Sequence, residues 1–350
     1  LQARSINLIK AAKGGDPAKL LPDYGNAFLF AAHPYGNPVS GSEETLAAIS
    51  HEQLLSYYGD FFGGDRLIVS VVGDFNMEAM KARLAAAFGE WRPAGAELPE
   101  LWAASRITGR RVLLIDKPGA TQTYFWIGNV GVAIDYPNRA SLHLANTVFG
   151  GRFTSMLNQE LRVKAGLTYG ARSLLHRHSR PGAVIISSFT ETARTIDVIE
   201  MALDVLGRLR RSGVDDDAAR SARNYIMGQF PPRLETAAQR ARQFAMLEQY
   251  DLDASYINDY GTMLQEAGVE SIAAAIDDVY PTSENVSFVL IGDAASIREA
   301  VADLGPVTEI SIDEPRFRRK ALFCRAGRVM FVNSTSWRSP RRRPLAPGRV

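Results

Sequence analysis

The stretch GGRFTSMLNQELRVKAGLTY, residues 150–169, contains the features from which the rest of the chain is interpreted. Four side chains recur there at helical spacing: Met156, Leu157, Leu161 and Lys164. Gly166 stands where a helix commonly ends in a left-handed residue, and an extended run begins at residue 167. The order predicts a glycine turn, a short helix and a strand, with Arg162 on the last helical turn and Tyr169 on the strand aimed at one region of space.

Length and composition indicate a globular chain. Its 350 residues can bury one large core or two ordinary ones, and the apolar share of 46% is typical of globular proteins. No apolar run is long enough for a membrane span. The single cysteine, Cys324, lies near the C-terminus, so the remainder can form neither a disulfide nor a thiolate metal site, and the redox compartment stays open.

The formal net charge of +2 conceals an asymmetry along the chain. From Arg316 onward there are ten arginines, one lysine and no acid, which leaves 29 basic against 38 acidic residues, a net charge of −9, in residues 1–315. An acidic body with a basic tail is not typical of a nucleic-acid-binding fold, so we expect no nucleic-acid partner.

The apolar pattern predicts a mixture of helices and strands before residue 150. A Ser-x-x-Gln capping box at Ser50 precedes one apolar helical face: Leu54, Leu55, Tyr58, Phe61 and Phe62. Residues 67–72 read as a buried strand ending in Gly73-Asp74. Asn76 then caps a helix with a core stripe of Met77, Met80, Leu84 and Phe88.

Later segments continue the mixture. We expect strands near residues 112–115, 121–130, 168–175, 183–189 and 286–291. Helices are expected at 138–148 and from 293 to 305. Four further helical segments within 193–280 are expected to be broken at Gly213, Pro231-Pro232 and Asp251. The acidic run Asp215-Asp216-Asp217 fits the first turn of one of these helices better than a metal site.

An internal repeat suggests how these elements are organised. Residues 50–74 and 269–293 both read as an amphipathic helix, a polar turn and a buried strand ending in Gly-Asp, with a constant offset of 219. With this offset, residues 1–92 align only with the rear (C-terminal) portion of the repeat unit. The hypothesis is therefore an α+β chain of two homologous domains, each a mixed, largely antiparallel sheet packed with helices, in which the first domain is incomplete.

The predicted boundaries follow from this repeat. We assign residues 1–92 to the rear of the first domain, 93–106 to a linker, and 107–306 to a complete second domain. Residues 307–350 form a basic tail that is expected to be disordered.

Six stretches together resemble the insulinase-like (pitrilysin-type) zinc metallopeptidases, including the bacterial processing-peptidase-like branch. They are His33-Pro34-Tyr35-Gly36, Val71-Val72-Gly73-Asp74, Asp116 to Gln122, Gly150 to Tyr169, Phe230 to Thr236, and Leu290-Ile291-Gly292-Asp293. The resemblance implies two homologous α+β domains that enclose a chamber, as the repeat suggested independently.

The resemblance also implies zinc, but this chain lacks the residues to bind it. The family binds zinc with an inverted His-x-x-Glu-His motif, whose glutamate acts as the base, and with a further glutamate. None of the five histidines belongs to such a motif: His33, His51, His143, His176 and His178. We expect His33 to cap or pack a loop, and His176 and His178 to be solvated strand residues. Zinc is thus expected for the whole enzyme in a missing front segment, with no catalytic residue and no metal ligand in this chain.

The resemblance also implies that this chain contains a pair of substrate-binding residues. Arg162 and Tyr169 match an arginine and a tyrosine that bind the peptide backbone near the scissile carbonyl in this family. Both side chains donate hydrogen bonds that can stabilise charge developing on oxygen. Gly150 and Gly151 would let a peptide come close, or form only a turn. The expected partner is a peptide or unfolded protein, with zinc supplied elsewhere.

Three readings of function remain open from the sequence. The first is part of a zinc metalloendopeptidase, which an upstream domain without His-x-x-Glu-His would contradict. The second is a non-catalytic subunit that pairs with a zinc-bearing partner, and the third is a structural relative without protease activity, like core subunits of respiratory complexes. Peptide specificity and oligomeric state are not predicted; a periplasmic or cell-envelope location is only a guess from bacterial relatives and the cysteine-free body.

Overall fold

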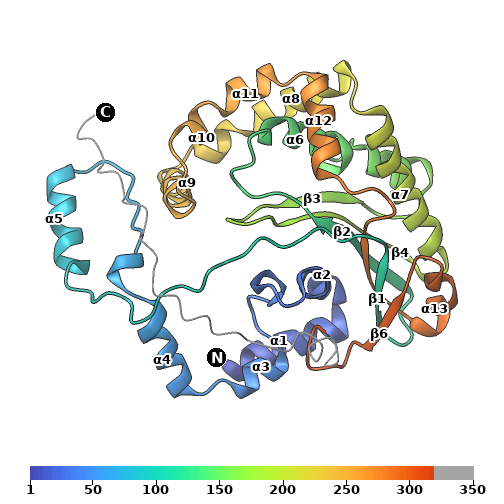
Figure 1. Ribbon diagram of the computed structural model, residues 1–350, viewed down its shortest axis with the longest axis horizontal. Coiled ribbons are helices and arrows are strands. Elements are labelled where there is room, and N and C mark those ends of the chain that lie inside the picture. The colour runs from blue at the N-terminus through green and yellow to red at the C-terminus, as the bar shows by residue number, and fades with distance from the viewer. Residues whose placement is uncertain (319–350) are drawn as a thin grey trace. The chain divides into compact units, whose positions relative to one another are not determined.

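The computed structural model describes residues 1–318, whose centre is one six-stranded sheet (Figure 1). The strands are β1 (Arg111–Asp116), β2 (Gln122–Val130), β3 (Arg172–His176), β4 (Ala183–Glu191), β5 (Ser287–Gly292) and β6 (Val307–Ser311). Their order across the sheet is β3-β4-β2-β5-β1-β6. β1 pairs in parallel with β5 and β6, whereas β2 with β4, β2 with β5, and β3 with β4 are antiparallel. The sheet is mixed, and the predicted α+β class is confirmed.

Both faces of the sheet are buried, because successive side chains point to opposite faces of a strand. Along β1, Val112 and Leu114 belong to one apolar cluster, while Leu113 and Ile115 belong to the other. A strand covered on both sides needs apolar residues at consecutive positions, and this explains its continuous apolar sequence.

The first face is covered by helices that follow β2 in the chain. They are α6 (Arg139–Asn146), α7 (Thr195–Ser212), α8 (Asp216–Gln229), α9 (Ala237–Gln249), α10 (Ser255–Asn258), α11 (Tyr260–Glu266), α12 (Val269–Val279) and α13 (Ala294–Ala302). The apolar stripes of α6, α7, α8, α11, α12 and α13 form the larger core with the sheet, whereas α9 and α10 contribute no residue to it. The chain breaks predicted at Gly213, Pro231-Pro232 and Asp251 fall between these helices. Asp215 caps α8 by accepting a hydrogen bond from the Ala218 N–H at 2.7 Å, which confirms the helix-start interpretation of the acidic run.

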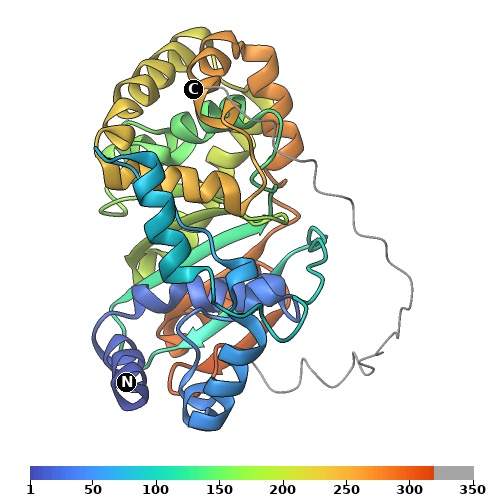
Figure 2. The same ribbon diagram turned by 90° about the vertical axis from the view of Figure 1, so that its left-hand side faces the viewer.

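The second face is covered by the N-terminal segment, α1 (Gln2–Gly15) and α2 (Leu21–Phe30), on the side away from α11 and α12 (Figures 1 and 2). Gly25 of α2 lies directly over the indole of Trp126, so that a Cβ at this position would be 2.9 Å from the ring. Leu21 and Tyr24 are buried beside it. Residues assigned to the first repeat thus complete the core of the second.

Residues 43–88 contain α3 (Glu43–Ala48), α4 (His51–Phe61) and α5 (Met77–Phe88) but bury almost nothing. The Ser50 capping box and the Asn76 cap are both formed, as predicted. No residue of α4 or α5 is buried: the predicted apolar face of α4 is largely exposed, with Leu55 at 58%, and so is part of the predicted core stripe of α5, with Met77 at 59%. The expectation that these stripes lie in a core is wrong for the chain as described, because no sheet within residues 1–318 lies against them.

The strand predicted for residues 67–72 is also absent from the structure. This segment forms neither helix nor strand, and Ile68 and Val69 are 41% and 43% exposed. The equivalent segment of the repeat is β5, which lies between β2 and β1. A strand is defined by its pairing, and nothing in the described part of the chain pairs with residues 67–72. The two copies therefore share a helix and a turn but differ in the strand.

The predicted domain end at residue 306 is too early. β6 begins at Val307 and pairs with β1, and Ile310, Ile312 and Phe317 are buried in the second core. The tail starts later than predicted, and residues 319–350 of it lie outside the described residues. Within residues 1–318, no helix is long and apolar enough to cross a bilayer.

The contact of α2 with the sheet predicts an unusual effect of an alanine substitution. Gly25→Ala improves helix propensity, but its Cβ meets Trp126 at 2.9 Å, so we expect a net loss of roughly 1–3 kcal/mol in unfolding free energy by urea denaturation. Gly228→Ala in α8 is the matched control, because its Cβ meets nothing within 4 Å. It should be neutral or stabilise by about 0.5–1 kcal/mol. Equal effects of the two substitutions would show that α2 does not pack as described.

Candidate functional site

Arg162 and Tyr169 meet in one exposed cluster. The Arg162 guanidinium lies 4.7 Å from the centroid of the Tyr169 ring and 4.5 Å from that of Phe153. Tyr169 is 76% exposed and Phe153 is 61% exposed. The predicted convergence of the pair is therefore present, and Phe153 is a third member that sequence reasoning missed. We call Arg162, Tyr169 and Phe153 the Arg–Tyr cluster.

Arg162 is presented by a widened helical turn. Residues Asn158–Lys164 form a π-helix, a rare geometry that is frequent at functional sites. Gly166 ends it with φ at 65°, as the sequence predicts, and its N–H donates to the Arg162 carbonyl at 3.1 Å. Glu160 anchors the same turn, since its carboxylate accepts from Arg208 of α7 at 3.1 Å and from Lys164 at 3.0 Å. The Lys164 hydrogen bond is the main cause that lowers the pKa of Glu160.

Tyr169 stands on a loop held by hydrogen bonds from β4. Thr168 Oγ1 bonds the Ser188 hydroxyl at 3.0 Å, and Thr190 Oγ1 donates to the Leu167 carbonyl at 2.7 Å. Asn158 joins this loop to the π-helix: its Oδ1 accepts from the Ala171 N–H at 2.9 Å. These side chains fix the backbone on both sides of Tyr169.

The loop corrects the prediction that Tyr169 lies on a strand. β3 begins only at Arg172, which pairs with Ser187. Beyond that pair Ser188 and Thr190 use their side chains, instead of ladder hydrogen bonds, to hold residues 167–170. The predicted strand near residues 168–175 is thus a short strand preceded by an anchored loop.

The two glycines at the head of the stretch differ in environment. Gly150 is buried, and a Cβ there would lie 2.4 Å from the Ser173 N, so the residue allows close packing against β3. Its expected role as a peptide contact is wrong, because no surface is left to a peptide. Gly151 is exposed, and its contact with peptide remains a prediction.

A cavity of about 320 Å³ opens beside Tyr169. Its lining comes from the Tyr169 loop, from β4 and from the start of β2: Gln122, Gly166, Leu167, Thr168, Tyr169, Phe189, Thr190, Glu191 and Arg194. The lining includes the Gln122 amide, the Glu191 carboxylate and the Arg194 guanidinium. The cavity therefore suits a polar ligand better than an apolar one.

The described residues do not supply a zinc site. Among residues 1–318 there is no group of three or more His, Cys, Asp or Glu side chains that could hold a metal ion. His33 is buried in a capping role, accepting from the Tyr35 N–H at 3.1 Å with Nδ1 while Nε2 bonds the Trp102 carbonyl at 2.8 Å. His176, at the end of β3, is half-buried and not solvated as expected, whereas His178 is exposed as expected but lies beyond the strand. Burial is the main cause that lowers the pKa of each.

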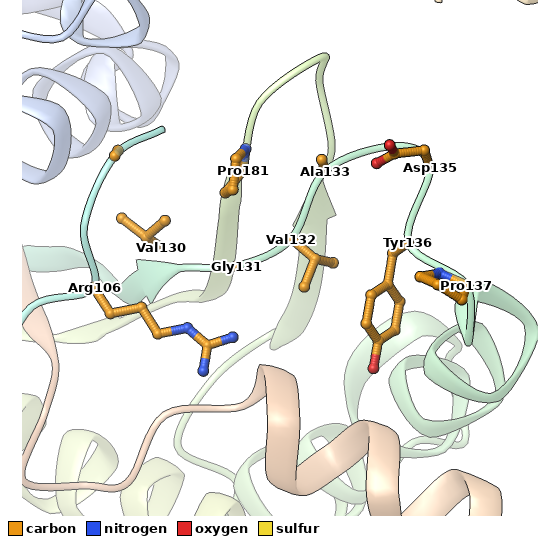
Figure 3. Close-up of a pocket in the computed structure, with 10 residues that line it drawn as sticks. Arg106, Val130, Gly131, Val132, Ala133, Asp135, Tyr136, Pro137 and Pro181 are labelled. Atoms are coloured by element: carbon orange, nitrogen blue, oxygen red, sulfur yellow. The ribbon is translucent and has the colours of Figure 1, made fainter. Parts of the chain in front are cut away.

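A second cavity, of about 480 Å³, lies where β2 ends and residues 131–137 pass Pro181 (Figure 3). In this view Arg106 lies at the left of the lining residues, and Tyr136 lies toward the right beside Pro137. Arg106 has a counter-charge in Asp278 at 3.7 Å. The polar side chains of this lining form neither a metal-ligand set nor a nucleophile–base pair, so we assign the cavity no catalytic role.

Comparison with known protein families identifies the chain's class. The family model described as the peptidase M16 inactive domain matches residues 48–226. The chain belongs to the peptidase M16 inactive-domain family. This confirms the resemblance to insulinase-like metallopeptidases that the six sequence stretches indicated.

The relatives agree with this assignment. An uncharacterized zinc protease of Mycobacterium leprae is 29% identical over 219 residues, which is 62% of this chain and 49% of the relative. A Helicobacter pylori relative, named a non-peptidase homolog, is 24% identical over 216 residues, covering 61% of this chain and 49% of the relative. The chain spans about half the length of these curated relatives.

A solved structure supports the fold of this M16 chain. The crystal structure of the peptidase M16 inactive domain from Pseudomonas fluorescens superposes with a TM-score of 0.75 at 22% identity, covering 83% of this chain and 68% of the other. At this identity the likeness concerns the fold alone.

The anchoring role of Asn158 predicts a local loss of order at the site. Asn158→Ala removes the acceptor of the Ala171 N–H and should cost about 1–3 kcal/mol in unfolding free energy, because buried backbone groups are left unpaired. It should also speed amide hydrogen exchange in residues 165–171. Gln159→Ala, one position along the same helix, is the control and should leave exchange unchanged. Equal exchange in both variants would contradict the anchor.

The burial of His143 predicts a pH dependence of folding. Burial first, then the positive charges of Arg177 and Arg233, lower its pKa from 6.5 to about 4. Below pH 6.5 the unfolded chain binds a proton that the folded chain excludes, so stability is lost as the pH falls from 6.5 towards 4, by roughly 3 kcal/mol in full. Urea denaturation between pH 7 and pH 4.5 measures the slope. His143→Gln should reduce it, whereas exposed His51→Gln should not.

Proposed function

We propose that this chain supplies the substrate-binding half of the peptide-cleavage chamber of a zinc-dependent metalloendopeptidase. The observation that carries the proposal is the meeting of Arg162 and Tyr169 in one exposed, anchored cluster on a chain of the M16 family. The ligand we propose is the backbone of a peptide or unfolded protein.

The geometry of the cluster suits backbone recognition. The stacking of Arg162 on the Tyr169 and Phe153 rings limits its motion and leaves guanidinium N–H groups free to donate. The exposed Tyr169 hydroxyl is a second donor, and both can bond carbonyl oxygens without reading the side chains of a peptide. Donors held in advance of binding stabilise oxygen charge more than donors that must first be ordered.

The chemistry of cleavage requires residues beyond those described. Zinc held by such residues would polarise the scissile carbonyl and activate water. The role of this chain is to bind and orient: Arg162 and Tyr169 position the peptide backbone, and the cavity beside Tyr169 accepts polar groups that flank it.

The exposed apolar surfaces of residues 49–98 support a zinc-bearing partner half. Leu54 and Leu55 on α4, Ile68 and Val69 after it, and Phe88 on α5 are each more than 40% exposed. Contiguous exposed apolar surface commonly marks an interaction site. We infer that a half carrying the zinc ligands, in the same protein or in a separate subunit, covers these residues.

The second candidate is a non-catalytic subunit of a heterodimeric processing-type peptidase. Its specific support is the match to an inactive-type domain and a relative named a non-peptidase homolog. This candidate predicts that a separate zinc-bearing protein, encoded nearby, co-purifies with the chain. If the combined proteins cleave no peptide, it fails.

Conservative substitutions test the binding role directly. Fluorescence anisotropy with a labelled casein-derived peptide should show roughly 2- to 12-fold weaker binding for Tyr169→Phe, which removes only the hydroxyl donor. Arg162→Gln should weaken binding more, by roughly 10- to 150-fold, because a charged donor is lost.

The controls are Tyr225→Phe and Arg220→Gln on the exposed surface of α8. Both should bind as the unsubstituted chain does. If the Arg162 and Tyr169 variants bind peptide as tightly as these controls, the cluster is not the substrate site. In a reconstituted peptidase, unchanged activity of Arg162→Ala would favour a structural relative without protease activity.

A further inference from the structure

A pocket remote from the Arg–Tyr cluster gathers three arginines and no acid. It has a volume of about 230 Å³ and lies among α6, the end of β3, the turn Pro231–Leu234, α9 and α11. Its polar lining consists of Arg139, His143, Arg177, Arg233, Gln243, Tyr256 and Tyr260. We call it the arginine pocket.

One arginine of the pocket has a buried nitrogen without a partner. The Arg177 Nη1 atom is shielded from solvent and has no hydrogen-bond partner among the described residues. A buried guanidinium N–H left unpaired is costly, so such a group is an indication of a missing acceptor. The arginine is half-buried overall, directly follows β3 and lines the pocket.

A second arginine is built into the wall. Arg139 is only 8% exposed and lies 3.8 Å from the centroid of the Tyr256 ring and 4.9 Å from that of Tyr260. It donates to the Tyr256 carbonyl at 2.6 Å. The aromatic rings hold the guanidinium plane and leave further donors for a bound group.

The pocket carries a net positive charge that no neighbour cancels. None of Arg139, Arg177 and Arg233 forms an ion pair with a carboxylate within residues 1–318. His143 is hydrogen-bonded to the Tyr260 hydroxyl. Its lowered pKa has Arg177 and Arg233 among its causes and no acid opposing them. The electrostatics therefore favour an anion.

We propose that the arginine pocket is a binding site for a compact oxyanion, a phosphate or a carboxylate group. Guanidinium groups bind both anions through paired N–H donors. A neutral ligand would leave the positive charge of three arginines around one cavity uncompensated. A volume of about 230 Å³ lies below the usual range for drug-sized ligands and admits one anionic group with few further atoms. This site does not rest on the proposed peptidase function, because it shares no residue with the Arg–Tyr cluster.

Phosphate binding is tested by thermal unfolding of the full chain at constant ionic strength. Replacing chloride by inorganic phosphate should raise the Tm of the unsubstituted chain, since a ligand that binds only the folded state stabilises it. Arg233→Gln, at an exposed position that should tolerate substitution, should weaken the apparent phosphate affinity by about tenfold or more.

The Arg177→Gln variant distinguishes a ligand-binding arginine from one that only stabilises the fold. Removing a half-buried guanidinium whose Nη1 atom is shielded and unpaired should raise the Tm without phosphate and abolish the phosphate response. Arg210→Gln is the matched structural control: Arg210 donates to the Ile276 carbonyl at 3.3 Å, so this variant should lose Tm while keeping the phosphate response. Arg220→Gln on the surface should change neither quantity.

The source of the anion is distinguished by a second ligand series. A tripeptide with a free C-terminal carboxylate is compared with its C-terminal amide at the same concentrations. Stabilisation by the acid but not by the amide, lost in Arg233→Gln, assigns the site to a peptide terminus, while a response to phosphate alone assigns it to a phosphorylated molecule. The proposal is overturned if no oxyanion raises the Tm beyond chloride, or if Arg220→Gln loses the response as fully as Arg233→Gln.

Discussion

The described structure depends on the burial of both faces of one mixed sheet. Each strand sends alternate side chains into two separate cores, and each core is closed by a different part of the chain. The helices after β2 close one face, and α1 and α2 close the other. Gly25 allows α2 to pack directly on Trp126. The N-terminal segment is therefore part of the same core as strands that begin about a hundred residues later in the chain.

This sheet also fixes the Arg–Tyr cluster without burying it. β3 and β4 hold the Tyr169 loop through Ser188 and Thr190, while Gly150 brings the preceding turn against Ser173. The side chains of Tyr169 and Phe153 stand outside this framework, where Tyr169 is 76% exposed and Phe153 is 61% exposed. Rigid backbone under exposed side chains is the arrangement expected of a binding site positioned before its ligand arrives.

Most of the fold around the sheet and two of the three residues of the Arg–Tyr cluster could be predicted from the sequence. Continuous apolar runs gave β1, β2, β4 and β5, and glycine at residue 166 marked the end of the π-helix, because these signals are local. Phe153 and Asn158 were missed because their roles come from contacts with Arg162 and Ala171, which no helix or strand spacing relates to them. Burial of the stripe on α5 was predicted wrongly for the same reason: a stripe shows what a helix can bury, not whether a partner is present.

The unpaired segment at residues 67–72 gives the chain a tendency to self-associate. Leu67-Ile68-Val69-Ser70-Val71-Val72 is rich in β-branched residues and has no charge, proline or glycine, the composition of segments that stack into cross-β fibrils. Four of its side chains are exposed, and its backbone has no ladder partner among residues 1–318. A strand that paired with this segment would therefore also protect the chain from self-association.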